Sequence, residues 1–248
     1  MKYSTPEALG ISSEDIKKYI DILEENKLAT HNVIIARGDS IIYEKYWAPF
    51  NADFLHRMYS VSKSFVSIAI GFAEQDGLLA LDDPMIKHFP EELNNQKDDN
   101  LKNQTVRDML MMCTAKGNPR GLDSKVSDRV RFYFENNFSV SRPSGKLFEY
   151  DTTGCFVLGA LVERLTGMKL MDYLRMKLFD KIGVSKEAYC LESAGGHSWG
   201  DSAVMCTAKD LLLVARFCLN KGKWNGKQLL NEKYITDAVS KQVDKSET

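Results

Sequence analysis

The stretch YSVSKSF, Tyr59 to Phe65, places a lysine at the start of an apolar, helix-like run that continues as VSIAIGFA over residues 66–73. Lysine is among the residues least often buried without a partner. Lys63 follows Ser60 by three positions, a spacing that puts both side chains on one face of a helix, one turn apart. The stretch therefore predicts a helix that carries a serine and a lysine side by side.

This pair has a chemical interpretation. Ser60 is expected to open a helix that ends at Asp76-Gly77, so the positive end of the helix dipole points at its side chain. That end stabilises negative charge on a carbonyl that Ser60 attacks. Apolar neighbours disfavour the charged form of Lys63, and a neutral lysine can take the serine proton as a general base. The pattern Ser60-x-x-Lys63 occurs once in the chain.

A structural interpretation of Lys63 is also open. Ser-x-x-Lys is a short pattern that arises by chance in chains of ordinary composition. A lysine on an amphipathic helix commonly lays its aliphatic stem over apolar surface and extends its ammonium group to solvent. Spacing alone does not choose between this arrangement and catalysis.

The composition excludes several classes of protein. The chain has 248 residues, is 44% apolar and 27% charged, and carries a formal net charge of -1, so no nucleic-acid or membrane partner is expected. No apolar leader opens the sequence, and its longest apolar run is shorter than the roughly 20 residues of a membrane span. The odd number of cysteines, without a C-x-x-C pair, indicates reduced thiols and a cytoplasmic location. Glycine-rich phosphate motifs and metal-ligand spacings of histidine are absent, so we expect no cofactor and no metal.

The order of elements predicts an α+β protein. Residues 33–36 and 41–46 are expected to form a hairpin around Gly38-Asp39, followed by many helices and no second set of strands. Thr105 and Thr207 are expected to cap helices. We predict one domain over residues 1–248. Its α/β lobe comprises about 1–76 and 196–248, and its helical lobe about 77–195.

The sequence also resembles the serine β-lactamase-related hydrolases, which include class C β-lactamases, penicillin-binding proteins and esterases. Ser-x-x-Lys is a signature of the penicillin-recognising enzymes. The resemblance implies an antiparallel sheet flanked by helices plus a mainly helical lobe. It rests on stretches that occur in the family's order: HRMYSVSKSF (56–65), GLLALDDPMIKHFPEE (77–92), LKNQTVRDMLMMCTAKG (101–117), FEYDTTGCFVLGALVERLTG (148–167) and GGHSWGDSAVMCTAKDLLLVARFCLNKGKWNGKQLL (195–230).

The resemblance assigns roles to residues of the cleft. Ser60 is the nucleophile and Lys63 its base. Tyr150, in the place of the family's Tyr-x-Asn motif, protonates the leaving group, although a packed loop tyrosine is the alternative. Asp151 and Thr152 are expected to bind substrate. Thr152 replaces the family's asparagine, and its hydroxyl lacks the paired donor and acceptor of an amide.

One further segment supplies two candidates for the cleft. Trp199 follows Gly195-Gly196 in a predicted loop and is expected to line the cleft, as is His197. Cys113 has neither an adjacent base nor a motif, so a cysteine hydrolase is unsupported.

The family's third motif, Lys or His followed by Thr or Ser and Gly on a C-terminal strand, is not found. We therefore expect the chain to be truncated relative to its relatives. The predicted function is hydrolysis of a small-molecule ester or amide, with a β-lactam as one candidate, through an acyl-serine. The alternative is a catalytically impaired homologue that acts as a binding module. The oligomeric state is left open.

Overall fold

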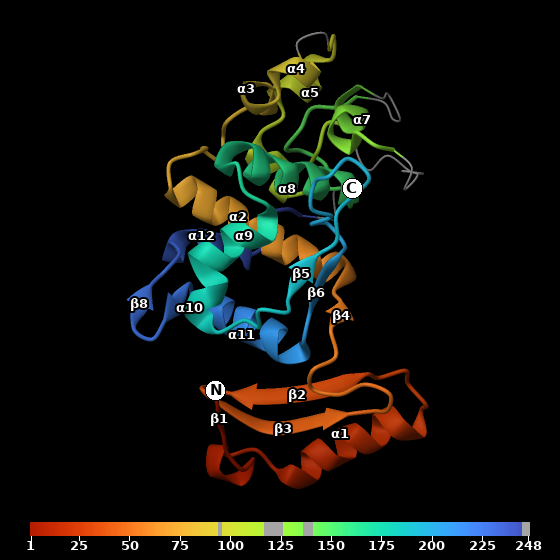
Figure 1. Cartoon of the computed structure of the whole chain (residues 1–248), viewed down its shortest axis with the longest axis vertical. Helices are drawn as coiled ribbons and strands as arrows, with labels where there is room; N and C mark the ends of the chain where they lie inside the picture. Colours follow the sequence, from red (N-terminus) through yellow and green to blue (C-terminus); the bar gives the residue numbers. More distant parts are fainter. Residues whose placement is uncertain (94–95, 117–125, 136–140, 245–248) are drawn as a thin grey trace.

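The computed structural model describes residues 1–93, 96–116, 126–135 and 141–244. It consists of a small sheet at one end and a larger helical part above it (Figure 1). We call residues 1–47 the sheet layer, and the described residues from Met58 onward the helical body. The combination of helices with mostly antiparallel strands is the predicted α+β class.

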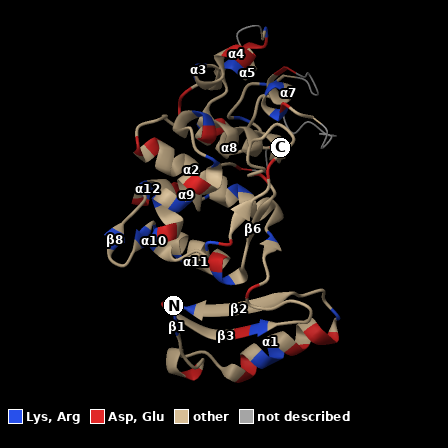
Figure 2. Cartoon of the chain, in the orientation of Figure 1, with Lys and Arg blue, Asp and Glu red and all other residues tan. Residues whose placement is uncertain are grey.

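The sheet layer contains the predicted hairpin. β2 (Asn32–Arg37) pairs antiparallel with β3 (Ser40–Tyr46), and the short β1 (Lys2–Tyr3) adds in parallel on the other side of β3. α1 (Ser13–Glu25) begins at the Ser12 cap, whose side chain accepts from the Asp15 N–H. Figure 1 shows α1 on the face of the sheet that is turned away from the helical body. Both acidic and basic residues lie along α1 (Figure 2), whose exposed side chains also include Tyr19 and Ile22.

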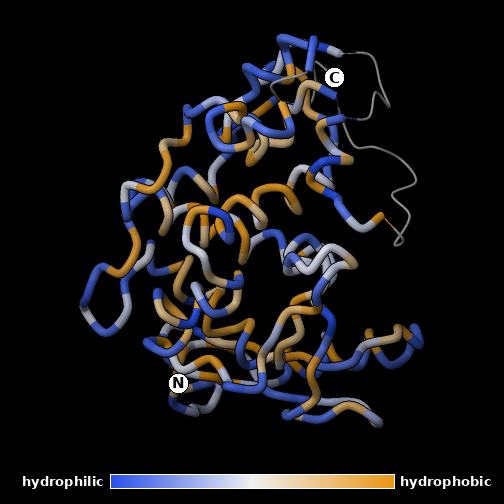
Figure 3. Tube along the Cα trace, turned by 45° about the horizontal axis from the view of Figure 1, so that its top comes forward, coloured by the Kyte–Doolittle hydropathy of each residue, from blue (hydrophilic) through white to orange (hydrophobic). Residues whose placement is uncertain are grey.

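The helical body is organised around α2 (Ser62–Gln75) and α8 (Thr152–Thr166), which pack against each other. Ten consecutive residues of α8, 153–162, are buried. In Figure 3 hydrophobic residues gather in the interior of the helical body, whereas hydrophilic residues dominate its periphery. The surrounding helices are α3 (Met85–His88), α4 (Pro90–Leu93), α5 (Asp99–Asn103), α6 (Val106–Leu110), α7 (Arg129–Glu135), α9 (Leu170–Leu174), α10 (Asp180–Ile182), α11 (Ala208–Leu219) and α12 (Glu232–Ala238).

Local signals in the sequence set several of these boundaries. Thr105 and Thr207 form complete capping boxes at the starts of α6 and α11, as predicted. α8 ends at Gly167, which adopts the left-handed conformation (φ 68°) that glycine favours at a helix end. A π-helical turn at Arg175–Phe179 lies between α9 and α10.

Two expectations about the elements are wrong. A second set of strands exists: β4 (His56–Arg57), β6 (Val204–Cys206) and β5 (Tyr189–Cys190) form a small sheet in the order β4-β6-β5. A further hairpin joins β7 (Lys223–Trp224) to β8 (Lys227–Gln228). These strands have two or three residues, too few to show an alternating pattern. The helix expected from Ser60 begins at Ser62, after a 3₁₀ turn at Tyr59–Val61.

Few polar links join the sheet layer to the helical body. α11 is the body helix that contacts β2. Lys209 Nζ of α11 lies 2.9 Å from Glu44 Oε1, and Arg216 pairs with Asp39. A cavity of about 430 Å³ lies between the two parts, lined by Tyr3 and Ile41 on one side and by α11 residues on the other. The boundary between the sheet layer and the body therefore includes a cavity and these two ion pairs.

Within the described ranges, no helix combines the length and apolar character that crossing a membrane requires. The cellular location stays a prediction of the sequence. The proposed division into lobes also stays a prediction. α2 packs against α8 of the helical body, and its first residue, Ser62, is bonded to β6.

Candidate active site

Ser60 lies in the 3₁₀ turn that leads into α2, and this turn is fastened to the small sheet. The Met58 N–H donates to the Val204 carbonyl at 2.8 Å. The buried Ser62 hydroxyl accepts from the Val204 N–H at 3.1 Å. β6 therefore holds the backbone on both sides of Ser60, which fixes where the Ser60 side chain points.

The three predicted catalytic residues meet at one oxygen. Lys63 Nζ lies 3.1 Å from Ser60 Oγ, and the Tyr150 hydroxyl donates to the same oxygen at 2.7 Å. The Lys63 nitrogen also lies 5.2 Å from the centre of the Tyr150 ring. Lys63 belongs to α2, and Tyr150 lies two positions before the start of α8. The packing of α2 on α8 thus brings together residues that are 90 positions apart.

Exposure differs sharply among these residues. Lys63 is 9% exposed, whereas Tyr150 is 47% exposed and Ser60 is open to solvent. Lys63 Nζ donates a second hydrogen bond to the Asp201 carbonyl at 2.8 Å. The buried lysine therefore has polar partners and does not extend to solvent. These partners offset the cost of burying its amine among apolar neighbours. A substrate can approach Ser60 from the open side.

Tyr59, directly before the serine, has a strained backbone. Its φ of 45° lies in the left-handed region that residues other than glycine rarely adopt. Its ring is 64% exposed and lies under the Arg57 guanidinium, whose carbon is 4.9 Å from the ring centre. Such strain concentrates at functional sites. Sequence reasoning missed this feature, since nothing in the residue type of Tyr59 signals it.

Asp151, expected to bind substrate, is turned inward. Its carboxylate is 1% exposed and accepts from the Gly154 N–H (2.8 Å), the Thr114 hydroxyl (3.1 Å) and the Tyr133 hydroxyl (3.2 Å). Burial raises its pKa to about 6. Asp151 therefore caps α8 and fixes the backbone next to Tyr150. Thr152, the first residue of α8, is half-buried, and its part in substrate binding stays a prediction.

Trp199 lies between two arginines. The guanidinium carbons of Arg57 and Arg129 are each 5.2 Å from its ring centre. Its contact with substrate stays a prediction. His197, from the same loop, bonds through Nδ1 to Glu163 Oε2 at 2.7 Å, which gives it a structural role at the end of α8.

A buried ion pair lies next to Lys63, and the sequence analysis predicted neither of its members. Arg129 Nη1 and Asp201 Oδ1 are 3.9 Å apart, with side chains 9% and 1% exposed. Arg129 Nε and Nη1 and Asp201 Oδ1 have no hydrogen-bond partner within the described part of the chain. Burial raises the pKa of Asp201, while the nearby Arg129 and Lys63 oppose that shift. Asp201 contacts Lys63 through a main-chain carbonyl, which any residue type supplies, so no sequence signal marks it.

The cysteines are all free thiols, as predicted. Burial raises the pKa of Cys155 and of Cys206 to about 12 and raises that of Cys113 as well, so these thiols are poor nucleophiles near neutral pH. Among the residues that the structure describes, no three His, Cys, Asp or Glu side chains are grouped as metal ligands would be.

The family assignment follows from the sequence match. The family model described as Beta-lactamase matches residues 17–234. The chain belongs to the beta-lactamase family. This assignment confirms the resemblance and the predicted fold, and the match includes Ser60, Lys63 and Tyr150.

Individual relatives of this beta-lactamase-family chain are distant. A 6-aminohexanoate-dimer hydrolase from Paenarthrobacter ureafaciens is 24% identical over 233 residues, which cover 88% of this chain and 58% of that protein. A Beta-lactamase from Yersinia enterocolitica is 23% identical over 156 residues, 61% of this chain and 39% of that protein. The chain thus spans little more than half the length of the first relative and less of the second.

Solved structures show the same fold. The octameric penicillin-binding protein homologue from Pyrococcus abyssi has a TM-score of 0.75 at 17% identity, covering 94% of this chain and 61% of that one. The D-amino acid amidase from Ochrobactrum anthropi SV3 has a TM-score of 0.67 at 18% identity, covering 87% of this chain and 72% of that one. At these identities the likeness concerns the fold alone.

Proposed function

We propose that this chain carries the catalytic centre of a serine hydrolase that cleaves an ester or amide through an acyl-serine. The observation that carries the proposal is the convergence of Lys63 Nζ (3.1 Å) and the Tyr150 hydroxyl (2.7 Å) on Ser60 Oγ. A nucleophile within hydrogen-bond reach of two proton-transfer groups is the arrangement that covalent catalysis requires.

Acylation begins with Ser60 Oγ. The oxygen forms a bond to the substrate carbonyl carbon, and its proton passes to Lys63. The Ser60 backbone N–H, near the start of α2, is the proposed donor to the resulting oxyanion. Tyr150 then gives its proton to the leaving nitrogen or oxygen as the carbonyl–heteroatom bond breaks. Lys63 returns its extra proton to Tyr150, and the acyl-Ser60 ester remains.

Deacylation uses the same groups in reverse. Water attacks the acyl carbon as the neutral Lys63 amine takes one of its protons, either directly or through Tyr150, which passes its own proton to Lys63. The Ser60–acyl bond then breaks, and the Ser60 oxygen recovers a proton from the same group. The ammonium charge that Lys63 acquires lies over the Tyr150 ring, 5.2 Å from its centre, where it stabilises negative charge on the phenol oxygen.

The substrate class is proposed from the relatives. A 6-aminohexanoate-dimer hydrolase and a D-amino acid amidase, by their names, both cleave amides. Thr152 in place of asparagine removes an amide group that could hold a substrate's own amide side chain. We therefore propose a small linear amide or ester as substrate, and a β-lactam as a second candidate because of the family to which the chain belongs.

The competing proposal is a binding module that retains the cleft without turnover. The intact meeting of Ser60, Lys63 and Tyr150 favours the enzyme.

Substrate turnover separates the two proposals. We would measure kcat/KM for a p-nitrophenyl ester, a p-nitroanilide and a chromogenic cephalosporin. The chain should be compared with its Ser60→Ala variant and with Ser64→Ala, an exposed serine on the same helix. We expect turnover of the ester or anilide that Ser60→Ala abolishes and Ser64→Ala preserves. A rate that persists in Ser60→Ala would contradict the acyl-serine mechanism, and binding without turnover would favour the binding module.

A further inference from the structure

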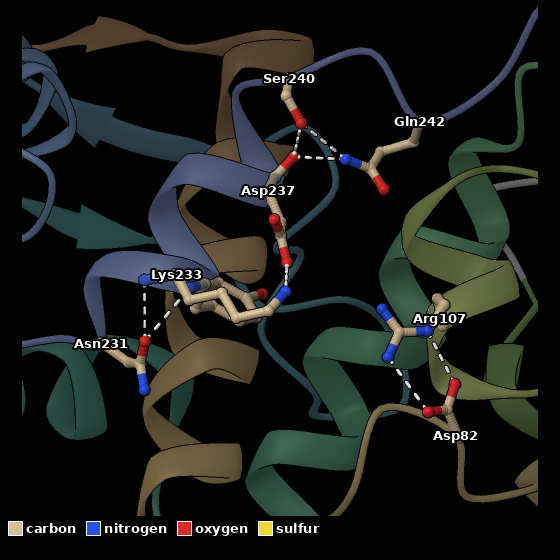
Figure 4. A network of polar contacts seen from close by, with 8 residues as sticks. Asp82, Arg107, Asn231, Lys233, Asp237, Ser240 and Gln242 are labelled. Atoms are coloured by element: carbon tan, nitrogen blue, oxygen red, sulfur yellow. Dashed lines mark hydrogen bonds and ion pairs between the residues drawn. The ribbon is translucent and has the colours of Figure 1, made fainter.

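A cavity of about 400 Å³ lies beside α2, away from the catalytic serine, in the size range of small-molecule sites. Glu74, one of its wall residues, follows Lys63 by eleven positions, which is about 16 Å along a helix. Figure 4 shows several of the polar residues at this cavity and their contacts. α2, α6 and α12 supply most of its lining, and the residues that the argument uses are Glu74, Leu81, Arg107, Leu110, Met111 and Lys233.

Most polar groups of this cavity already have partners. Arg107 donates to both carboxylate oxygens of Asp82, at 2.7 and 3.1 Å. Lys233 Nζ lies 2.5 Å from Asp237 Oδ2, and the Tyr234 hydroxyl donates to the Ser67 carbonyl at 2.6 Å. These pairs, several of them visible in Figure 4, fix the rim without leaving free charge.

Glu74 differs from these groups. Its side chain is half-buried, and it has no hydrogen bond or close ion pair in the described part of the chain. Burial raises its pKa, although Arg107 and Lys233 act in the opposite direction. The charged groups at the cavity are the cations Arg107 and Lys233 and the anions Glu74, Asp82 and Asp237. Because the other four charges pair with one another, the carboxylate of Glu74 is left over, and the site favours a cation.

Part of the cavity lining is apolar. Leu81, Leu110 and Met111 are half-buried and face the cavity, and Ala238 of α12 adds a methyl group. A ligand that pairs its charge with Glu74 can therefore lay a short hydrocarbon chain on this apolar part. Removing that chain from water adds to the affinity, and the gain grows with each methylene group that is buried.

We propose that this cavity binds a primary alkylammonium compound, with its ammonium group on the Glu74 carboxylate and its chain against Leu81, Leu110 and Met111. The site is separate from Ser60, and its occupation does not depend on the proposed hydrolysis. An alkanoate of the same length is rejected, because its carboxylate would meet Glu74.

Ligand titration by NMR tests the proposal on the chain as it is. Hexylamine, hexanol and hexanoate would each be added to the ¹⁵N-labelled chain at pH 8, up to 10 mM. We expect hexylamine alone to shift amide signals of the second half of α2 and of α12. Glu74→Gln should weaken its binding at least tenfold, while Glu25→Gln, a change to an exposed carboxylate of α1, should leave it unchanged.

Several outcomes would overturn the proposal. These are no shift at 10 mM, equal binding of hexanol or hexanoate, unchanged binding in Glu74→Gln, or shifts confined to residues around Ser60. Glu74→Gln is nearly isosteric, and an amide spectrum that otherwise matches the parent chain shows that the variant is folded. Turnover is not needed for any of these readouts, so a failure here is distinct from a failure of the proposed hydrolase activity.

Discussion

The sheet layer and the helical body differ in how much apolar surface they bury. In the sheet layer, a separate cluster contains Ile16, Ile20 and Ile42 as its buried members. In the body, one continuous cluster extends from α2 through α8 to α12. All three proposed catalytic residues belong to the body. The chemistry therefore depends on elements that are held by dense packing, which a precise site requires.

The contrast also concerns charge. The body holds a buried ion pair, Arg129 with Asp201, next to the proposed catalytic lysine. The sheet layer carries exposed pairs such as Lys45 with Glu24, whose side chains are 32% and 44% exposed. Buried charges depend strongly on their partners, whereas exposed charges are screened by water. The same type of substitution should thus have different consequences in the two regions.

The largest effect is expected at the catalytic lysine. Lys63→Met keeps the length of the side chain and removes the proton acceptor, so ester hydrolysis should fall by about 10²–10⁴-fold. Lys17→Met, on the exposed face of α1 in the sheet layer, should leave the rate unchanged. Both rates would be measured with the p-nitrophenyl ester. A loss below threefold in Lys63→Met would remove Lys63 from the mechanism.

The second effect concerns the buried pair. Arg129→Met removes the ion-pair partner of the buried Asp201 carboxylate, and breaking a buried pair typically costs about 3–5 kcal/mol. Lys45→Met in the sheet layer removes an exposed partner and should change stability little. Urea denaturation gives both free energies of unfolding. Equal losses in the two variants would contradict the contrast in burial.

How much of this site could be read from the sequence depends on the distance between its parts. Ser60 and Lys63 are one helical turn apart, so local spacing predicts their contact. Tyr150 lies 90 positions from Ser60. Its place in the site came from the family resemblance, because no local rule reaches that far. The hairpin and the capping boxes were also predictable, because they depend on residues that are close together in the sequence.

The remaining features had no signal in residue types. Asp201 acts through its carbonyl oxygen, and Tyr59 through a backbone angle. β5 and β6 are too short to show a pattern, and β6 is tied to the distant Ser62, whose hydroxyl accepts from the Val204 N–H. Asp151 was expected at the substrate, but an aspartate before a helix serves equally as an N-cap. Only the packing of α7 and α8 shows that it is buried.

The third prediction compares two isoleucines of similar burial. Ile70 of α2 is 0% exposed and belongs to the body cluster, and Ile20 of α1 is 4% exposed and belongs to the small cluster. Truncation to alanine generally costs about 2–5 kcal/mol, more where the surroundings cannot collapse. We expect Ile70→Ala near the upper end and Ile20→Ala near the lower end. A larger loss for Ile20→Ala in urea denaturation would reverse the contrast.

The smallest effect is a difference in pH dependence. Burial raises the pKa of Asp151 to about 6, above the value near 3.9 of an unfolded chain. Between these two values the folded state holds a proton that the unfolded state has lost. The contribution of Asp151 to stability is therefore fully present below about pH 4 and is lost as the pH rises through 6. Asp151→Asn keeps a good N-cap and should remove this fall.

Glu44 of the sheet layer should act in the opposite direction. Burial raises its pKa, but hydrogen bonds from Lys209, Tyr3 and Tyr46 outweigh it and hold the pKa below its usual value. Its contribution to stability is therefore present above about pH 4.3 and is lost as the pH falls. Glu44→Gln should flatten the acid side of the stability profile and leave the region between pH 4 and 6 as it is. The same direction for both variants would contradict the two environments.

Intact-protein mass spectrometry after exposure to a fluorophosphonate and, separately, to a penicillin tests the central claim most directly. We expect one adduct on the chain with at least one reagent, its loss in Ser60→Ala, and its retention in Ser64→Ala. An adduct that persists in Ser60→Ala, or no adduct with either reagent on a folded sample, would contradict the proposal that Ser60 is the nucleophile.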